Sequence, residues 1–348
     1  MAEAARRGPP PLRTRDGLAR LEPAGDEAYE RLLAGRPEAT FFHTRTWARI
    51  VARAFPHLED CSGILSVEGR PHALPLFRWS RWRGLSTTLH SGFPFLYGGP
   101  VPADATAWRA CLALLADSRA AVTLIGNPLA PPLAETDPPA GLSLRDEETH
   151  LLALPESIEA YRDSILSPRK RSYIRRLARE GVFVEPTRSA EDLAAVYGLY
   201  RRRMAAWERE AGFVYPIDFY RAMLEIGGDA VRLYAARREG RLIGGAFIVR
   251  WNGCAHYCTG FYDDQARDLR PNLMIQEKVI GDAIADGFRR YDFLPSAGLA
   301  GVEAFKASLG GELVPFPRWE RSSPVQRWAR VARALLRRGP GRERHGDA

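Results

Sequence analysis

One pattern occurs twice in this chain and limits its architecture more than any other feature. Residues 64–77 read ILSVEGRPHALPLF and residues 233–249 read LYAARREGRLIGGAFIV, so each joins two apolar runs through Glu-Gly-Arg. Apolar and aromatic runs on both sides of a Gly-containing turn are typical of a β-hairpin. Two similar hairpins, one in each half of the chain, indicate a duplicated module.

The segments around each hairpin support this interpretation. Apolar spacing after Phe41 and Phe42 predicts a helix that carries Trp47, and further patterns predict a helix over 107–116 and a strand over 121–125. The second half predicts helices over 170–180, 190–208, 217–226 and 273–286, with strands over 254–262 and 290–294. Helices followed by an antiparallel hairpin, and then by strand, helix and strand, predict an α+β fold with mixed sheets and flanking helices.

Length and composition agree with two globular domains. The chain has 348 residues, of which 45% are hydrophobic and 26% are charged. We expect a disordered basic leader over 1–20, an N-terminal domain over 21–150, a C-terminal domain over 151–316, and a basic amphipathic helix and tail over 317–348. The leader is rich in Arg and Pro without the apolar core of a secretory signal, and no stretch is long enough to span a membrane. We therefore expect a cytoplasmic protein.

The charge and the cysteines narrow the class of protein further. The formal net charge of +8 indicates an anionic partner such as a phosphate group, a nucleic acid or a lipid surface, although an arginine-rich composition also follows from a GC-rich genome. Four cysteines scattered at positions 61, 111, 254 and 258 do not form a disulfide framework. No recognised DNA-reading motif is present, so we expect no DNA partner.

The segment after residue 266 carries the most specific pattern. Four elements follow one another there: Pro271-Asn272, Asp286-Gly287, Tyr291-Asp292-Phe293, and Phe305-Lys306 with Gly310. In this order and spacing they resemble the end of the FemAB-like, or BioF2-like, acetyltransferase domain of the GNAT superfamily. The sequence departs from that pattern at Leu294-Pro295 and at Leu309-Gly310-Gly311, which leaves the fold in place but the substrate class open.

The resemblance extends over about residues 41–316 and implies two tandem GNAT-like domains that transfer an acyl group. GNAT-type enzymes hold the donor where two central strands separate, beside a helix N-terminus that binds phosphate. Here the helix that begins near Asn272, with Asn272 as its cap, is the candidate. The usual glycine-rich loop is missing before it, so Arg270 is either a phosphate ligand or a solvated charge.

A basic run precedes this domain. Arg169, Lys170 and Arg171 lie within the segment PRKRSYIRR and could bind a phosphorylated substrate, a lipid pyrophosphate or an RNA backbone. The alternative is a solvated helix face.

The resemblance implies a functional role for Lys306, either pairing with a donor phosphate or stabilising a developing oxyanion as a point charge. The alternative is a surface lysine. We expect it at the end of a closing strand and loop. Asp292, on a short apolar strand, is expected either to act as a general base or to orient its neighbours, with the second role favoured.

The remaining candidates are substrate contacts. His256 and Tyr257 stand in the run CAHYC, whose alternate residues share one face of a strand. We interpret this run as a core strand and not as a zinc site, because metal-binding cysteines normally lie on turns. Tyr215, Phe305 and Trp207 are further aromatic candidates, although most such residues belong to the core.

Together these residues predict an N- or O-acyltransferase that uses acyl-CoA as a co-substrate, without a permanently bound cofactor, on a cell-envelope or exopolysaccharide precursor. The alternatives are an aminoacyl-tRNA-dependent peptidoglycan aminoacyltransferase and a non-catalytic GNAT-like binding module. Residues 324–338 read PVQRWARVARALLRR, a basic amphipathic pattern that either contacts the inner face of a membrane or docks on the protein. The first location would suit a lipid-linked acceptor.

Overall fold

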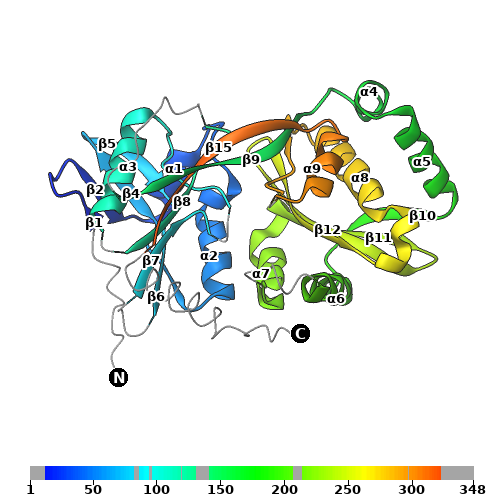
Figure 1. Ribbon diagram of the computed structural model, residues 1–348, viewed down its shortest axis with the longest axis horizontal. Coiled ribbons are helices and arrows are strands. Elements are labelled where there is room, and N and C mark those ends of the chain that lie inside the picture. The colour runs from blue at the N-terminus through cyan, green and yellow to red at the C-terminus, as the bar shows by residue number, and fades with distance from the viewer. Residues whose placement is uncertain are drawn as a thin grey trace, which may run out of the picture.

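The computed structural model describes residues 12–81, 86–93, 96–118, 120–130, 141–206, 214–296 and 298–322. The helices and strands form two lobes, which a pair of long strands connects (Figure 1). The first lobe contains β1 (Leu12–Arg13), β2 (Ala19–Pro23), α1 (Asp26–Leu33), α2 (Arg45–Ala54), β3 (Leu58–Asp60), β4 (Gly63–Val67), β5 (Arg70–Leu74), β6 (Phe77–Arg81), β7 (Ser86–Ser91), α3 (Ala105–Asp117) and β8 (Ala121–Ile125).

The second lobe follows the connecting strand β9 (Ser143–Ala153). It contains α4 (Ile158–Ala160), a π-helical turn (Tyr161–Ile165), α5 (Pro168–Arg179), β10 (Val182–Thr187), α6 (Ala190–Ala206), α7 (Ile217–Gly227), β11 (Val231–Arg238), β12 (Arg241–Trp251), β13 (Cys254–Tyr262), α8 (Pro271–Ala285), β14 (Arg290–Asp292) and α9 (Ala300–Ala307). The chain then returns to the first lobe through β15 (Glu312–Arg321).

Both predicted hairpins are present, and the duplication extends beyond them. β4 pairs with β5 and β11 with β12, and each two-residue turn has two left-handed residues, Glu68-Gly69 and Glu239-Gly240. This is the type I′ geometry that suits a tight hairpin. After each hairpin comes a strand, a helix and a parallel strand: β7, α3 and β8 in the first lobe, β13, α8 and β14 in the second. The α+β fold predicted from the sequence is confirmed.

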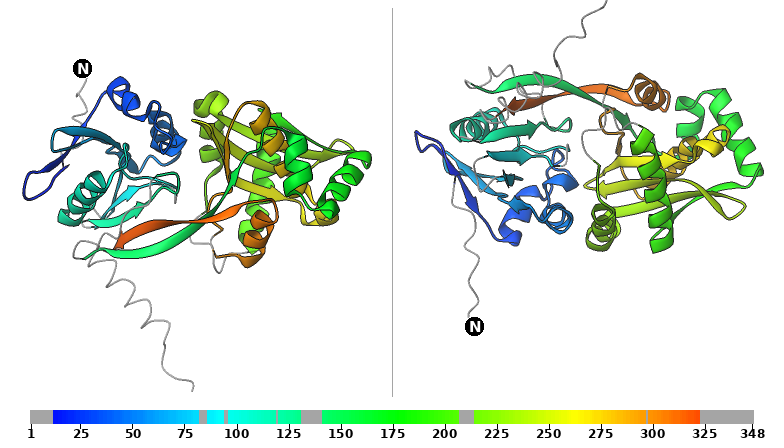
Figure 2. Two further views of the ribbon diagram at one scale, coloured as in Figure 1. Left: turned by 90° about the horizontal axis from the view of Figure 1, so that it is seen from above. Right: turned by 60° about the horizontal axis from the view of Figure 1, so that its bottom comes forward.

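The two lobes share one continuous sheet. Its eleven strands run in the order β10-β11-β12-β13-β14-β9-β15-β8-β7-β6-β3, and a separate sheet contains β1-β2-β4-β5. β9 follows the first lobe but pairs at its end with β14 of the second, whereas β15 follows the second lobe and pairs at its end with β8 of the first. The two strands lie antiparallel beside each other between these ends, as Figures 1 and 2 show. The sheet of each lobe therefore includes a strand that begins at the other lobe.

Two predicted boundaries differ from this arrangement. Residues 12–20, assigned to a disordered leader, instead contribute to β1 and β2, because Ala19 and Leu21 alternate inward and pack in the core of the first lobe. The divisions at 150 and 316 fall inside β9 and β15. The sequence did not predict these two strands, since their many charged residues hide the alternation that marks a half-buried strand.

An aromatic core joins the lobes. Trp47 on α2 meets Phe219 on α7 with ring centroids 5.8 Å apart, and Phe55 meets the same ring at 5.6 Å. Figure 1 shows α2 and α7 facing each other across the junction. Edge-to-face contacts between fully buried rings stabilise a fixed arrangement beyond the area that they bury. The two lobes are therefore parts of one packed unit.

Candidate active site

The candidate site begins where two parallel strands separate. β13 pairs with β14 only over Cys254–Arg290, Ala255–Tyr291 and His256–Asp292. β13 continues to Tyr262 along β12, with an extra residue at Cys258 where the register between these two strands shifts. β14 ends at Asp292, so in the described part of the chain no strand covers this edge of β13 after His256. The six residues to Tyr262 extend over about 20 Å at strand geometry.

Asp292 is the centre of a buried network at the point of separation. Its side chain is 0% exposed. Oδ1 accepts hydrogen bonds from the Thr149 hydroxyl at 2.7 Å and from the Leu294 amide at 2.9 Å, and Oδ2 lies 3.0 Å from His256 Nδ1. A buried carboxylate is stable only when it has such partners. Because these contacts already occupy it, Asp292 is poorly suited to accept a proton from an acceptor, and an orienting role fits it better.

His256 lies between Asp292 and the first lobe. Its ring is fully buried, 5.2 Å from the ring of Phe42 and 6.3 Å from that of Tyr97, and Nε2 has no hydrogen-bond partner among the described residues. Burial alone lowers the pKa of His256, but the neighbouring Cys254 and Asp292 reverse this and raise it above its usual value. Burial, followed by the charge of Asp292, raises the pKa of the Tyr97 phenol. The first lobe thus contributes side chains to this network.

Lys306 lies beside the same network. Its side chain belongs to α9 and is 3% exposed, and Nζ donates to the Leu294 carbonyl oxygen at 2.5 Å. Burial lowers the pKa of this ammonium group to about 8, although Asp292 and Glu303 oppose the effect. The sequence analysis expected Lys306 at the end of a strand and loop. It stands instead near the end of a helix, and the alternative of a surface lysine does not fit its burial.

Gly310 explains how α9 can pack so closely. Its φ is +90°, and a Cβ atom there would lie 2.3 Å from Ile165 Cγ2. Only glycine fits a position that combines left-handed backbone with such a close approach. The glycine that follows Phe305-Lys306 in the sequence therefore ends α9 against the π-helical turn and keeps Lys306 directed inward.

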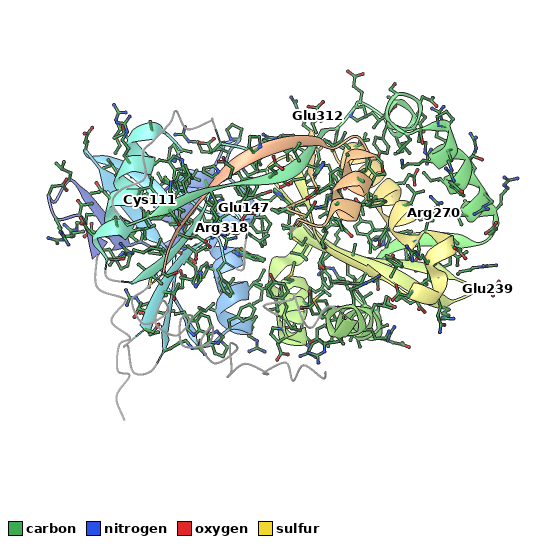
Figure 3. The ribbon with its side chains drawn as sticks, in the orientation of Figure 1. Cys111, Glu147, Glu239, Arg270, Glu312 and Arg318 are labelled. Carbon is green, nitrogen blue, oxygen red and sulfur yellow. The ribbon has the colours of Figure 1, made fainter. Side chains whose placement is uncertain are left out.

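A second group of candidates meets at the N-terminus of α8. The ring of Tyr173 on α5 has three guanidinium groups over it, those of Arg270 at 4.0 Å, Arg176 at 5.0 Å and Arg169 at 5.6 Å. Burial and the charge of Arg270 lower the pKa of Lys170. These five residues, called the Tyr173 cluster below, bring the predicted basic run beside the N-terminus of α8. Figure 3 shows Arg270 at the end of the second lobe.

The N-terminus of α8 differs from the prediction. Asn272 was expected to cap the helix, but the cap is Arg270, in left-handed backbone (φ +42°), and Pro271 is the first helical residue. Asn272 lies within the first turn, and its buried Oδ1 has no hydrogen-bond partner in the part of the chain that the structure describes. Pro271 has no N–H, and the amides of Leu273 and Met274 donate to the Arg270 carbonyl. Few amides are left there to hold a phosphate, so side chains supply most of the positive charge.

Three other candidates take separate positions. Arg171 donates to the carbonyl groups of Arg162 and Asp163, so it supports the π-helical turn and does not belong to the Tyr173 cluster. The ring of Tyr215 is stacked on Phe219, 5.1 Å between centroids, within the aromatic core. Phe305 packs, partly buried, against the core of the second lobe.

Tyr257 lies in the separated part of β13. Its hydroxyl is close to Gly260 of the same strand, where an added Cβ would stand 2.1 Å from it. Burial raises the pKa of this phenol, while a hydrogen bond with Gln276 of α8 lowers it. Tyr257 therefore packs between α8 and the part of β13 that β14 does not accompany. Among the predicted substrate contacts, Tyr257 lies between the network around Asp292 and the Tyr173 cluster.

Sequence reasoning missed Thr149, Tyr97 and Tyr173. Thr149 and Tyr97 carry no local signal, because their partners Asp292 and His256 come from distant parts of the chain. Tyr173 could have been found, since it stands inside the basic run at the spacing that places Arg169 and Arg176 on the same helix face. Trp207 and residues 324–338 lie outside the described residues.

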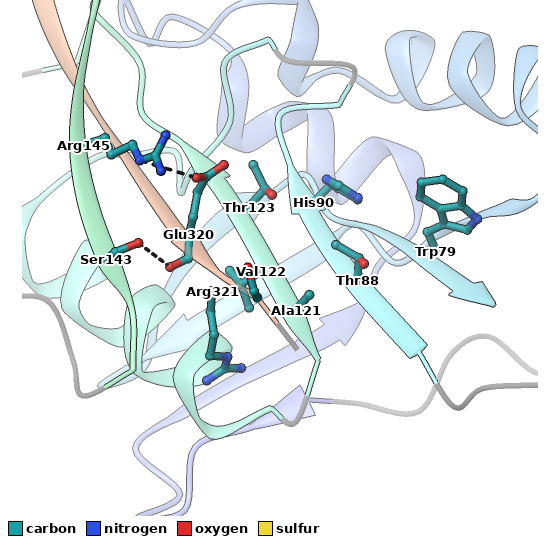
Figure 4. A pocket seen from close by; sticks show the side chains of 11 residues that line it. Trp79, Thr88, His90, Ala121, Val122, Thr123, Ser143, Arg145, Glu320 and Arg321 are labelled. Atoms are coloured by element: carbon teal, nitrogen blue, oxygen red, sulfur yellow. Dashed lines mark hydrogen bonds and ion pairs between the residues drawn. The ribbon is translucent and has the colours of Figure 1, made fainter. Parts of the chain in front are cut away.

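A surface hollow of about 340 Å³ lies in the first lobe, away from Asp292. Trp79, Thr88, His90 and Thr123 form one side, and Ser143 and Glu320 the other (Figure 4). Glu320 already pairs with Arg318 and Arg145. Ser143 is eight residues along β9 from Leu151, the partner of Asp292, which is about 26 Å at strand spacing. The hollow therefore does not belong to the buried network.

Parallel strands that separate, with a helix that begins beside their open end, are the arrangement expected of a GNAT-type domain. In agreement, residues 168–307 match the family model described as "Acetyltransferase (GNAT) domain", and this part of the chain is a GNAT-type acetyltransferase domain. Among curated proteins, no sequence matches the chain.

Solved structures resemble the whole chain. FemX has a TM-score of 0.63 at 15% identity, over 85% of this chain and 96% of FemX. The C-terminal domain of a protein from Agrobacterium fabrum assigned as a lysylphosphatidylglycerol synthetase has a TM-score of 0.55 at 12% identity, over 90% and 98%. A tandem GNAT protein from the clavulanic acid biosynthesis pathway has a TM-score of 0.51 at 15% identity, over 86% and 95%. These similarities show the fold, and they agree with a FemAB-like tandem GNAT architecture. In the described part of the chain, no helix is long and apolar enough to cross a membrane.

Proposed function

We propose that this protein is an aminoacyl- or acyltransferase that acylates an amine or hydroxyl group of a cell-envelope precursor, with its reacting centre in the second lobe. The observation that carries the proposal is the arrangement of the opening beside β13. The Tyr173 cluster stands near its outer end and Lys306 near its inner end. A donor with a phosphate-bearing part at the cluster would extend along the separated part of β13, which is about 20 Å long at strand geometry, and would bring its reactive carbonyl toward Lys306.

Acyl transfer requires only a few chemical tasks of the residues near Lys306. The acceptor's lone pair attacks the donor carbonyl carbon, the C–O or C–S bond to the carrier breaks, and the acceptor's proton passes to the departing oxygen or sulfur of the carrier. Negative charge develops on the carbonyl oxygen during the attack. A buried ammonium group stabilises that charge strongly because little water screens it. Lys306, which keeps its proton below pH about 8, supplies such a group at neutral pH.

The class of donor follows from the outer end. Cationic side chains around an aromatic ring, on an exposed helix, suit an extended phosphate backbone with stacked bases. They are less suited to a compact pyrophosphate, which GNAT-type sites hold mainly by backbone amides that α8 lacks. The proposal therefore favours an aminoacyl-tRNA donor. Acyl-CoA remains the second candidate, because residues 168–307 match an acetyltransferase model.

The acceptor class rests on the named neighbours. FemX and the assigned lysylphosphatidylglycerol synthetase share the fold of the whole chain, and the second name states a phospholipid product. A lipid-linked acceptor would also suit the basic amphipathic pattern of residues 324–338 as a peripheral membrane contact.

Binding of the donor can be tested with full-length protein and three probes: acetyl-CoA, bulk aminoacylated tRNA and the same tRNA after deacylation. We expect tRNA to raise the melting temperature, with an affinity that falls steeply with salt. Arg270→Ala should weaken this binding roughly tenfold, the effect of losing one charge-assisted contact. Arg175→Ala, an exposed arginine on α5 outside the cluster, is the matched control and should change little.

Catalysis can be tested with Lys306→Ala, and with Lys278→Ala as the control on the surface of α8. Loss of a donor for the oxyanion typically costs about 100- to 1,000-fold in rate. We expect the first variant to lose deacylation of the bound donor and the second to retain it. Binding of acetyl-CoA with the same dependence on Arg270 would transfer the proposal to acyl-CoA. If neither donor binds, the proposal fails and the protein is a non-catalytic binding module.

A further inference from the structure

The turn after β14 links two groups that the mechanism treats separately. The Leu294 amide donates to Asp292 Oδ1, and the Leu294 carbonyl oxygen accepts from Lys306 Nζ. Leu294 itself is left-handed, with φ +55°, and 4% exposed. A bulky residue adopts this backbone only where the surroundings impose it. One carboxylate thus holds, through its amide, the residue whose carbonyl oxygen holds the lysine.

The carboxylate is itself held from two directions. Thr149, on β9, donates to the same oxygen that accepts from Leu294, and His256, on β13, meets the other oxygen. All three side chains are fully buried. A side chain with this many partners has one conformation, and the turn that depends on it is fixed in the same way. The neighbouring Phe293 amide donates to the His150 carbonyl oxygen, which ties the turn to β9 a second time.

We infer that Asp292 is a positioning residue for Lys306, and that Thr149 and His256 act through it by holding the left-handed turn at Leu294 against the Lys306 ammonium group. This inference rests on the proposed function in one respect, the role of Lys306 in stabilising the developing oxyanion. The contacts by themselves assign the task of fixing Lys306 to a carboxylate whose oxygens already meet Thr149, Leu294 and His256. Thr149 brings the connecting strand β9 into that task, so the site needs an element that no single lobe provides.

The charged groups around Lys306 make the inference measurable. Asp292 faces the ammonium group from β14, Glu303 from its own helix and His150 from β9. Asp292→Asn removes the charge but keeps an oxygen for Leu294, whereas Thr149→Val keeps the shape of the threonine and removes its hydroxyl. Thr149→Ser restores the hydroxyl. These three variants separate the effect of charge from that of position.

The experiment uses full-length protein labelled with ¹³C and ¹⁵N at lysine, and it needs no substrate. The chain has three lysines, so Lys170→Arg, Lys278→Arg and Lys306→Arg assign every side-chain signal. We expect the Lys306 signal of the wild type to titrate below the ordinary range of a lysine, because burial lowers its pKa. Asp292→Asn should move its titration to still lower pH, because the attraction that favours the charged form is lost. The Lys278 signal should not move.

Thr149→Val tests position. We expect the Lys306 signal to broaden or split and its titration to shift, and Thr149→Ser to return it to the wild-type value. A Lys306 signal unchanged in both Asp292→Asn and Thr149→Val would overturn the inference, provided that Thr149→Val melts as a folded protein. If these variants do not shift the Lys306 titration, the inference fails and the proposed function still stands. If they shift it as expected but the wild type transfers no acyl group, only the proposed function is contradicted.

Discussion

At the scale of single residues, Lys306 is unusual because it is a buried ammonium group in a chain that otherwise relies on arginine. Burial holds its pKa at about 8 against an ordinary value of 10.5. This difference corresponds to a cost of about 3 kcal/mol for keeping the folded lysine charged at neutral pH. We expect a protein to keep a residue with such a cost only where its charge has a function. The cost itself can be tested without any substrate.

Lys306→Met, which keeps most of the side-chain volume, should stabilise the fold at pH 7 by about 1 to 3 kcal/mol while it abolishes transfer. Below pH 8 both the folded and the unfolded lysine are charged, so the cost is fully present. Between pH 8 and 10.5 the folded lysine loses its proton before the unfolded one, and the cost disappears. Denaturant unfolding at several pH values should show the advantage of the variant shrinking over this range. A variant less stable than the wild type at pH 7 would contradict the burial cost.

At the scale of elements, the sequence predicted those that have their own pattern and failed for those that depend on distant partners. The two hairpins, the helix that carries Trp47 and the strands at 254–262 and 290–294 were all predicted, because periodicity and turn residues are local signals. β15 reads ELVPFPRWER, where two prolines and four charged residues conceal a strand. Its pairing with β9 and β8 supplies the order that its own residues do not specify.

The same distinction explains what could be predicted of the candidate site. Lys306, Asp292 and Arg270 were found from motifs in one stretch of sequence. Thr149 was not, since nothing around it indicates the carboxylate that it meets across the sheet. Asn272 was given the role of a cap because the left-handed backbone of Arg270 cannot be predicted for an arginine.

β15 should be important for the first lobe although it is the most distant element along the chain. Trp319 is 1% exposed, and its ring lies 5.1 Å from that of Trp108 on α3. Trp319→Ala should therefore cost about 3 to 5 kcal/mol in the free energy of unfolding. Leu313→Ala on the same strand, where the side chain is 53% exposed, should cost less than about 1 kcal/mol. Similar melting temperatures for the two variants would show that β15 does not complete that core. Arg318 on β15 and Glu147 on β9, both labelled in Figure 3, form an ion pair that holds the two strands together.

At the scale of the whole molecule, the shared sheet and the shared aromatic core should make the two lobes unfold together. Calorimetry of the full-length protein should give one transition, with the calorimetric enthalpy equal to the van 't Hoff enthalpy. Phe219→Ala, at the junction of α2 and α7, should lower the temperature of that single transition without dividing it. Two separate transitions in the wild type would mean that the lobes are independent domains.

The exchange of strands between the lobes also affects how the chain folds during its synthesis. Ile125 in β8 meets its partner Arg318 only after the intervening chain has left the ribosome, a delay of about 10 to 40 s at ordinary rates of synthesis. Until then β8 presents an open edge, which is the kind of surface that pairs with other chains. The growing protein therefore has to tolerate an unfinished first lobe, and we expect it to depend on chaperones more than a protein whose lobes close in the order in which they are translated.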